Sequence, residues 1–153
     1  MNSIKIIDYQ PAHQKHFEKF NRYWIEKYFV MEPVDEFVLT NPEEALLKPG
    51  GAILMAEFEG EIAGTVALRK VDDTTFEFTK MAVDNKFQRK GIAQALSHAS
   101  FKKAKVLGAE KVILYSNSML TPAICLYEKL GFEHVPVGEP GYNRSDVKME
   151  ISV

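Results

Sequence analysis

The chain has 153 residues and a mass of 17.4 kDa, which suits a single domain spanning residues 1–153. Apolar residues make up 46% of the chain and charged residues 26%, which excludes a disordered tail, a collagen and a disulfide scaffold. The net charge of −2 argues against nucleic acid as the main partner, because domains that bind phosphate backbones are usually basic.

The N-terminal third predicts one strand followed by two helices. Loose alternation over residues 3–9 predicts the strand. From Pro11 to about Tyr28, aromatic residues recur at spacings of three and four, which predicts a helix that ends before Pro33, and residues 35–41 predict a short second helix. The apolar face of the long helix consists of Phe17, Phe20, Trp24 and Tyr28. We interpret this face as core, with substrate binding as the alternative.

The middle of the chain predicts a three-stranded meander. Residues 51–58 and 61–70 predict two strands joined in a hairpin by Glu59-Gly60, and residues 74–83 predict the third. Alternation along the third strand predicts that its two faces carry different residues. One face would hold Phe76, Phe78 and Lys80, and the other Glu77, Thr79, Met81 and Val83.

The C-terminal part predicts a helix from 91 to about 107, a buried strand at 111–116, and a helix with Thr121 as its N-cap. Prolines and glycines predict a surface loop over residues 135–141, and residues 143–151 alternate as a last strand. A meander next to helical connections indicates a mixed α/β sheet with helices on its faces.

The junction between the strand at 74–83 and the helix at 91 is a candidate anion site. It contains the pattern Gln-x-x-Gly-x-Ala, formed by Gln88, Gly91 and Ala93. The first turn of a helix presents unpaired amides, and a glycine lets phosphates approach the backbone. Arg89 and Lys90 add positive charge. The alternative is an ordinary loop glycine before a helix.

The same region carries a resemblance to a known family. The segment FTKMAVDNKFQRKGIAQAL resembles motif A of the GNAT superfamily of acyl-CoA-dependent N-acetyltransferases. The segment ILYSNSMLTPAICLYEKLGF resembles motif B, and YNRSDVKME resembles the closing strand of many bacterial members. The resemblance implies a mixed, mostly antiparallel sheet of six to seven strands, splayed at the centre and covered by helices on both faces.

The resemblance also implies acetyl-CoA as co-substrate and no metal. The pantetheine arm would pair with the backbone of Met81, Ala82 and Val83, and the side chain of Asn117 would hold it. The diphosphate would lie on the backbone amides of one short segment. This segment consists of Gln88, Arg89, Lys90, Gly91, Ile92 and Ala93.

Two residues match catalytic positions of the superfamily. Tyr127 would protonate the departing thiolate, and a phenol with a pKa of about 10 stays protonated at neutral pH. The alternative is a core tyrosine whose hydroxyl bonds a backbone group. Glu77 would deprotonate the amine directly or through water, and burial beside two phenylalanines would raise its pKa. The alternative is a solvent-facing residue paired with a lysine.

The acceptor amine is less clearly indicated. Tyr23, Phe29 and Glu32 would line its pocket, because the superfamily uses this region as one substrate wall. The acidic residues of the region would attract a cationic amine, although solvated helix charges explain them equally well. These residues are Glu26, Glu32, Asp35 and Glu36.

The resemblance therefore implies an N-acetyltransferase that moves an acetyl group from acetyl-CoA to a primary amine by direct attack. Cys125 lacks a histidine placed to activate it, so packing is favoured over an acyl-cysteine. The alternatives are a non-catalytic acyl-CoA sensor on the same fold and a protein or peptide N-acetyltransferase. Paired monomers are common in the superfamily, which makes a homodimer an open expectation.

Cellular location follows from simple features of the sequence. A single cysteine fits the reducing cytoplasm. The start MNSIKIIDYQ lacks the basic and apolar regions of a signal peptide, and no apolar stretch is long enough to cross a bilayer. We therefore expect a cytoplasmic protein with no membrane partner.

Overall fold

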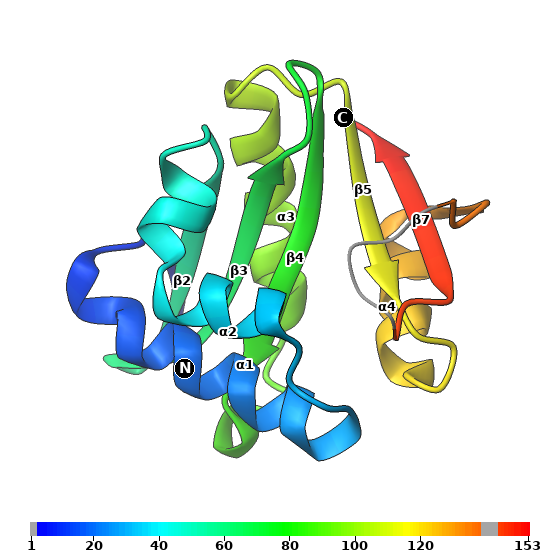
Figure 1. Cartoon of the computed structure of the whole chain (residues 1–153). Coiled ribbons are helices and arrows are strands. Elements are labelled where there is room, and N and C mark those ends of the chain that lie inside the picture. Colours follow the sequence, from blue (N-terminus) through cyan, green and yellow to red (C-terminus); the bar gives the residue numbers. More distant parts are fainter. Residues whose placement is uncertain (1–2, 139–143) are drawn as a thin grey trace.

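The computed structural model describes residues 3–138 and 144–153 (Figure 1). The loop predicted at 135–141 and the strand predicted at 143–151 fall partly outside these residues. In the described part of the chain, no helix has both the length and the apolar content needed to cross a membrane.

Within these described residues, seven strands form one sheet in the spatial order β1-β2-β3-β4-β5-β7-β6. Only β4 and β5 run parallel, and all other neighbours are antiparallel. The mixed, mostly antiparallel sheet is therefore confirmed. The strands are β1 (Ile4–Asp8), β2 (Ala52–Phe58), β3 (Glu61–Lys70), β4 (Thr75–Val83), β5 (Lys111–Ser116), β6 (Glu133–Val135) and β7 (Val147–Ser152).

Helices cover both faces of this sheet (Figure 1). Helices α1 and α2 lie over one face, and α3 lies over the other. The helices are α1 (Gln14–Tyr28), α2 (Pro33–Thr40), α3 (Ile92–Val106) and α4 (Thr121–Leu130). Three short turns complete the chain: η1 (Pro11–His13), η2 (Glu43–Leu47) and η3 (Asn85–Phe87).

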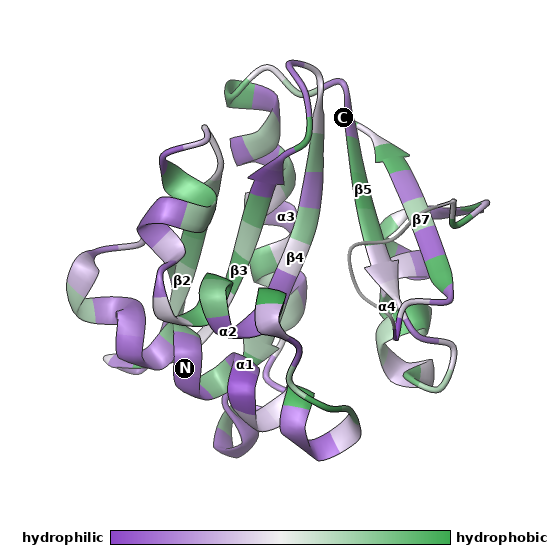
Figure 2. Ribbon diagram, in the orientation of Figure 1, coloured by the Kyte–Doolittle hydropathy of each residue, from purple (hydrophilic) through white to green (hydrophobic). Residues whose placement is uncertain are grey.

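Alternation along the strands divides the hydrophobic side chains into two cores. Leu54 of β2 packs in the same cluster as Leu96 of α3, whereas Met55 packs with Phe17 of α1 and Leu39 of α2. In Figure 2 hydrophobic residues run along β2, β3 and β5, and hydrophilic residues dominate α1. Burial on both sides explains why these strands are rich in apolar residues.

A β-bulge interrupts the alternation of β4. Thr79 pairs with Ala67 and Ala82 pairs with Thr65, so Lys80 and Met81 together oppose a single residue of β3. Lys80 has a φ of 53°, in the left-handed region. The bulge moves Lys80 to the face that carries Asp35 and moves Met81 into the core of the opposite face. The faces predicted for Lys80 and Met81 are therefore wrong. The face predicted for Val83 is also wrong, because Val83 packs in the same core as Phe76 and Phe78.

The sheet opens beyond the first residues of β4 and β5. These strands pair only over Thr75–Glu77 and Lys111–Ile113, after which each continues without the other. Figure 1 shows the two strands separating toward the end at which α4 lies. The predicted central splay is confirmed.

Local capping explains small differences at helix ends. Helix α2 begins at Pro33 rather than 35, because Glu32 and Asp35 form a capping box in front of it. Thr121 is the first helical residue of α4 and not its N-cap, which is Leu120. Gly131 ends α4 with a φ of 106°, the left-handed conformation typical of a glycine cap.

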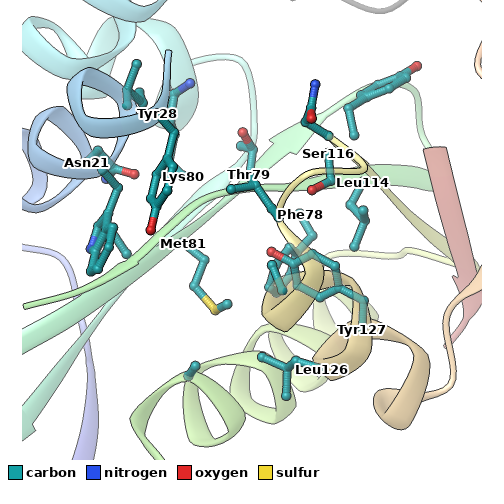
Figure 3. Close-up of a pocket in the computed structure, with 18 of the residues that line it drawn as sticks. Asn21, Tyr28, Phe78, Thr79, Lys80, Met81, Leu114, Ser116, Leu126 and Tyr127 are labelled. Carbon is teal, nitrogen blue, oxygen red and sulfur yellow. The ribbon is translucent and has the colours of Figure 1, made fainter. Parts of the chain in front are cut away.

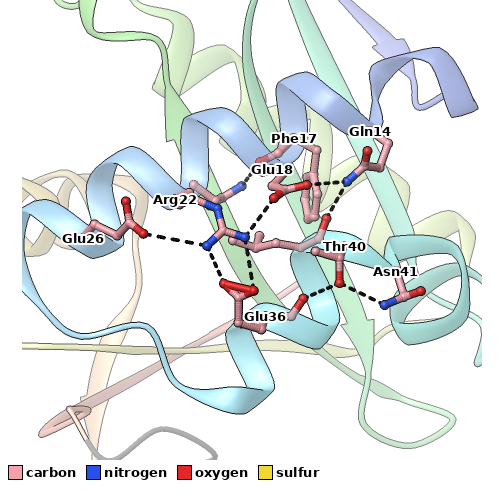
Figure 4. Close-up of polar contacts among 10 residues, drawn as sticks. Gln14, Phe17, Glu18, Arg22, Glu26, Glu36, Thr40 and Asn41 are labelled. Carbon is pink, nitrogen blue, oxygen red and sulfur yellow. Dashed lines mark hydrogen bonds and ion pairs between the residues drawn. The ribbon is translucent and has the colours of Figure 1, made fainter.

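Ion pairs on the outer surface join α1 to α2 (Figure 4). The guanidinium of Arg22 bonds the carboxylates of Glu36 and Glu18, the latter at 2.8 Å, and lies 3.7 Å from Glu26. Exposed pairs of this kind are each worth about 1 kcal/mol or less. They orient α2 on α1 and engage Glu26 and Glu36 on the solvent side.

Candidate functional site

A cavity of about 390 Å³ occupies the opening between β4 and β5 (Figure 3). Its walls come from α1, from both diverging strands, from α4 and from the residues just before β7. Figure 3 shows Tyr127 and Leu126 on one side of this space and Tyr28, Asn21 and Lys80 on the other. The fold thus brings together residues from nearly the whole length of the chain.

The open edge of β4 presents backbone groups to the cavity. The Asp84 amide bonds the Ala63 carbonyl at 2.7 Å, so alternation directs the Val83 amide away from β3 and toward the opening. The Val83 carbonyl is already engaged by Trp24 Nε1 at 2.9 Å and Gln88 Nε2 at 3.0 Å. Val83 therefore offers a donor at this edge, while its acceptor is occupied.

The same alternation separates the three residues predicted to contact pantetheine. Met81 directs its backbone groups to the opening, as Val83 does. Ala82 lies between them, and its carbonyl points toward β3. A Cβ atom placed on Gly64 of β3 would lie only 3.2 Å from this carbonyl oxygen. Ala82 lines the cavity, but its backbone does not serve the predicted pairing.

The turn before α3 has the geometry of an anion site. Arg89 and Gly91 both adopt left-handed backbone conformations, with φ values of 62° and 82°. Gly91 is the N-cap of α3, and no side chain caps it. Among the described residues, no oxygen accepts a hydrogen bond from the amides of Gly91, Ile92 or Ala93. These donors line a small hollow that shares Val83, Gln88, Ala93 and Leu126 with the main cavity.

Tyr127 lies on the α4 side of the cavity. Its ring packs edge-on against Phe78 and Phe132, with centroids 5.7 and 5.9 Å away. In the part of the chain that the structure describes, no group hydrogen-bonds the phenol, so the alternative of a backbone-bonded hydroxyl is not found. Burial raises the pKa of Tyr127 to about 12, which keeps the phenol protonated.

Glu77 does not lie in the cavity lining. Its side chain is 4% exposed, and its carboxylate bonds Arg69 Nε at 2.9 Å across the β3–β4 pair. The alternative of a solvent-facing glutamate paired with a lysine is also wrong, because the residue is buried and its partner is an arginine. The geometry supports a structural ion pair more directly than contact with an amine in the cavity.

A buried cluster of charges closes the end of the cavity near α2. Asp35 is fully buried, and its carboxylate bonds Lys80 Nζ at 2.9 Å and the Arg144 guanidinium at 2.9 Å through both oxygens. Arg144 also bonds Glu32 at 2.9 Å and lies over the ring of Phe29. Lys80 and Arg144 line the cavity, whereas Asp35 lies behind them.

Comparison with known proteins agrees with this geometry. Residues 49–134 match the family model described as an acetyltransferase (GNAT) domain. The chain belongs to the GNAT acetyltransferase family. It is 38% identical over 88 residues to the human N-acetylaspartate synthetase. The aligned region covers 57% of this chain and 29% of that protein. The chain spans 29% to 48% of the length of the N-acetylaspartate synthetases it matches.

Solved structures of GNAT proteins share the fold. An acetyltransferase of the GNAT family from Staphylococcus aureus Mu50 superposes with a TM-score of 0.88 at 20% identity, covering 98% of this chain and 99% of that one. The PaiA N-acetyltransferase of Thermoplasma acidophilum, solved with coenzyme A, has a TM-score of 0.77 at 18% identity and covers 99% of both chains.

The residues predicted to line the acceptor pocket divide into those that line the cavity and those that do not. Phe29 lines the cavity, whereas Glu32 lies outside the lining, contrary to prediction, and bonds Arg144. Tyr23 is 43% exposed and lies outside the lining, contrary to prediction. Trp24 and Tyr28, interpreted from sequence as core, line the cavity instead. Their position at the C-terminal end of α1, beyond the buried Phe17 and Phe20, explains the difference.

Asn117, from GNAT motif B, lines the cavity but already has protein partners. Its side-chain nitrogen donates to the Arg144 carbonyl at 2.6 Å, and its side-chain oxygen accepts from the Met119 amide at 2.9 Å. These bonds connect the end of β5 to the residue that carries the guanidinium of the buried cluster. Asn117 therefore has a clear structural role beside the contact predicted for it.

Asp35→Asn is expected to lower the free energy of unfolding at pH 7 by about 3 kcal/mol, because it leaves buried cations without their counterion. Burial alone would raise the pKa of Asp35, but the Arg144 hydrogen bond and the Lys80 charge outweigh it and lower the pKa to about 2. The ionised carboxylate thus stabilises the fold above about pH 4, and this contribution is lost as the pH falls toward 2.

Urea unfolding at neutral and acidic pH measures this effect. The difference in the free energy of unfolding between the wild type and Asp35→Asn should become smaller from pH 7 to about pH 3. Glu36→Gln, on the solvent side of the same helix, is the control and should cost about 1 kcal/mol or less. A loss for Asp35→Asn no larger than that of the control would contradict the buried cluster.

Proposed function

We propose that this GNAT domain is an N-acetyltransferase that transfers an acetyl group from acetyl-CoA to a primary amine. The observation that carries the proposal is the set of amides at Gly91, Ile92 and Ala93 beside the opening of β4 and β5. These amides have no acceptor within residues 3–138 and 144–153. Membership of the family and similarity to the human N-acetylaspartate synthetase support the proposal. We further propose that residues 1–153 act as one domain, because β1 and β7 both belong to the sheet.

The residues around the turn fit a CoA diphosphate. The amides of residues 91–93 would donate to phosphate oxygens, and the dipole of α3 favours an anion there. Arg89 and Lys90 are exposed on the same turn and add positive charge. Ala93 lines both the hollow and the main cavity, so its small side chain leaves the connection between them open. The Met81 backbone would pair with the pantetheine arm, and the Val83 amide, whose own carbonyl is occupied, would face the thioester.

Acetyl transfer then needs a hydrogen-bond donor at the thioester carbonyl oxygen and a general acid at the departing CoA sulfur. Acetyl-CoA supplies the activated acyl group as a thioester. The amine nitrogen bonds the carbonyl carbon, the carbon–sulfur bond breaks, and the amine loses a proton to water. The Val83 amide would donate to the carbonyl oxygen, and Tyr127 would donate its proton to the sulfur. The proton released by the amine restores the phenol through solvent.

Glu77→Gln is expected to leave kcat within about threefold of the wild type, since a carboxylate that only pairs with Arg69 removes no proton from the amine. A glutamate acting as the base, directly or through ordered water, would instead make the variant slower by about 100-fold or more. Thiol release at saturating acetyl-CoA distinguishes the two. Unfolding of Glu77→Gln is followed in parallel, because the variant weakens a buried ion pair.

Two measurements test the proposed function as a whole. Calorimetric titration with acetyl-CoA tests binding, and thiol release against polyamines, aminoglycosides, amino acids and short peptides tests transfer. We expect saturable binding and thiol release with at least one primary amine. Binding without transfer across the panel would identify a sensor, and absence of binding would overturn the proposal.

A further inference from the structure

The ionisable lining of the cavity is positively charged. Among its described residues, Lys80 and Arg144 are the only charged side chains, and neither Asp nor Glu contributes to the wall. The acidic residues that were expected to attract a cationic amine lie elsewhere. Glu26 and Glu36 bind Arg22 on the solvent side, Asp35 is fully buried, and Glu32 lies outside the lining.

The cluster holds these two cations at the wall of the cavity. Asp35 receives bonds from both of them and from the Glu32 amide, so its carboxylate is fixed behind them. The left-handed backbone at Lys80 directs this side chain to the α2 face, and the Phe29 ring lies 5.6 Å from the Arg144 guanidinium. Backbone strain that serves to place one side chain is typical of binding sites.

We propose that the acceptor is an amino acid or a similar small amine whose carboxylate binds the Arg144–Lys80 wall. This inference rests on the proposed function and identifies the class of acceptor. The N–H donors of arginine and lysine at a partly desolvated wall favour a carboxylate as ligand, while Asp35 and Glu32 balance their charges from behind. A polyamine or aminoglycoside would instead bring further positive charge against two cations.

The spacing along β4 limits the size of this acceptor. Lys80 precedes Val83, the residue proposed to contact the reacting carbonyl, by three positions. Three extended residues span about 10 Å, and the bulge at Lys80 shortens this span. The Lys80 and Arg144 side chains and the acceptor bound to them must fit within this span. The amine and the carboxylate therefore belong to one small molecule, separated by a few bonds.

Matched acceptors test the proposal. Aspartate, glutamate and phenylalanine are compared with their α-amides, and phenylalanine also with phenethylamine, by kcat/KM for thiol release. We expect at least one acid to exceed its amide by about tenfold or more, the usual effect of a charged hydrogen bond. Amides or carboxyl-free amines that react as well as the acids would overturn the proposal.

Variants test whether Arg144 causes the preference. Arg144→Gln should lower kcat/KM for the acids by about tenfold and leave the amides within about threefold, and Arg144→Lys should keep part of the preference. Arg22→Gln, an arginine that pairs with the same helix on its solvent side, is the control and should not change the ratio. Equal losses for acids and amides in Arg144→Gln would show a merely structural role and contradict the proposal.

A binding measurement keeps this proposal separate from the proposed function. N-acetylphenylalanine and its amide differ only in the carboxylate, and both are titrated into the protein saturated with CoA. The acid should bind about tenfold more tightly than the amide, and Arg144→Gln should abolish the difference. Equal binding overturns the acceptor class even if acetyl transfer is observed, and a preference without transfer leaves the acceptor class standing while the transferase fails.

Discussion

Tyr127→Phe is expected to lower kcat by about 100-fold or more while the Kd for acetyl-CoA stays within about threefold. The phenol lies at the cavity wall with no hydrogen-bond partner among the described residues, so it is available to protonate the leaving sulfur. Phenylalanine fills the same space against Phe78 and Phe132 and removes only the acid. Packing and cofactor binding should therefore persist.

The pH dependence gives this prediction a second readout. The raised pKa of about 12 means that Tyr127 keeps its proton, and so its role as an acid, up to strongly alkaline pH. The rate of the wild type should not fall through loss of this proton between about pH 8 and 10. A basic limb in that range that disappears in Tyr127→Phe would contradict the assigned pKa.

Tyr9→Phe is the matched control for this substitution. Tyr9 is buried outside the cavity, and its hydroxyl bonds Glu43 at 2.8 Å. Removing that hydroxyl should cost about 1 kcal/mol of stability and leave kcat unchanged. Thiol release and urea unfolding are measured for both variants. A Tyr127→Phe enzyme with kcat close to that of the control would show that another group protonates the thiolate.

Ala93→Asp is expected to weaken acetyl-CoA binding by about 100-fold or more. A carboxylate at this position would lie beside the diphosphate, and like charges about 5 Å apart repel by about 3 kcal/mol at an effective dielectric constant near 20. The protein itself should remain stable, because an aspartate in the first turn of α3 interacts favourably with the helix dipole. Loss of binding then cannot be attributed to unfolding.

Ala93→Asn separates charge from size. Asparagine has nearly the volume of aspartate and no charge, so its Kd should lie well below that of Ala93→Asp. Calorimetry gives the Kd of both variants, and thermal unfolding without ligand gives their stability. If both variants bind acetyl-CoA as the wild type does, the diphosphate does not lie at the start of α3.

Most elements of the fold follow from local pattern. The helix predicted from 91 to about 107 matches α3, and the strands predicted at 51–58 and 61–70 match β2 and β3 within a residue. In these segments periodicity agrees with the glycines and turns at their ends. The three-residue strand β6 was not predicted, because Glu133–Val135 is too short to show alternation.

The bulge at Lys80 is a feature that periodicity does not contain. It arises from the register between β4 and β3, and it decides which face receives Lys80. The same register places Glu77 opposite Arg69, so its carboxylate pairs with that guanidinium outside the cavity lining. Sequence alternation gives the two faces of a strand but not the partner across from each residue.

The site combines residues that are distant in sequence. The motif pattern indicated Gly91 and Tyr127 as site residues; Gly91 lines the hollow before α3, and Tyr127 lines the main cavity. The bond from Trp24 to Val83 and that from Arg144 to Asp35 join residues 59 and 109 positions apart. Such contacts depend on how α1, α2 and the segment before β7 pack, which a single sequence does not specify.

A crystal structure of the protein with coenzyme A tests the central claim most directly. The account predicts phosphate oxygens within about 3.2 Å of at least two of the amides of Gly91, Ile92 and Ala93, with the pantetheine arm between β4 and β5. A diphosphate bound elsewhere, with those amides facing only water, would contradict it.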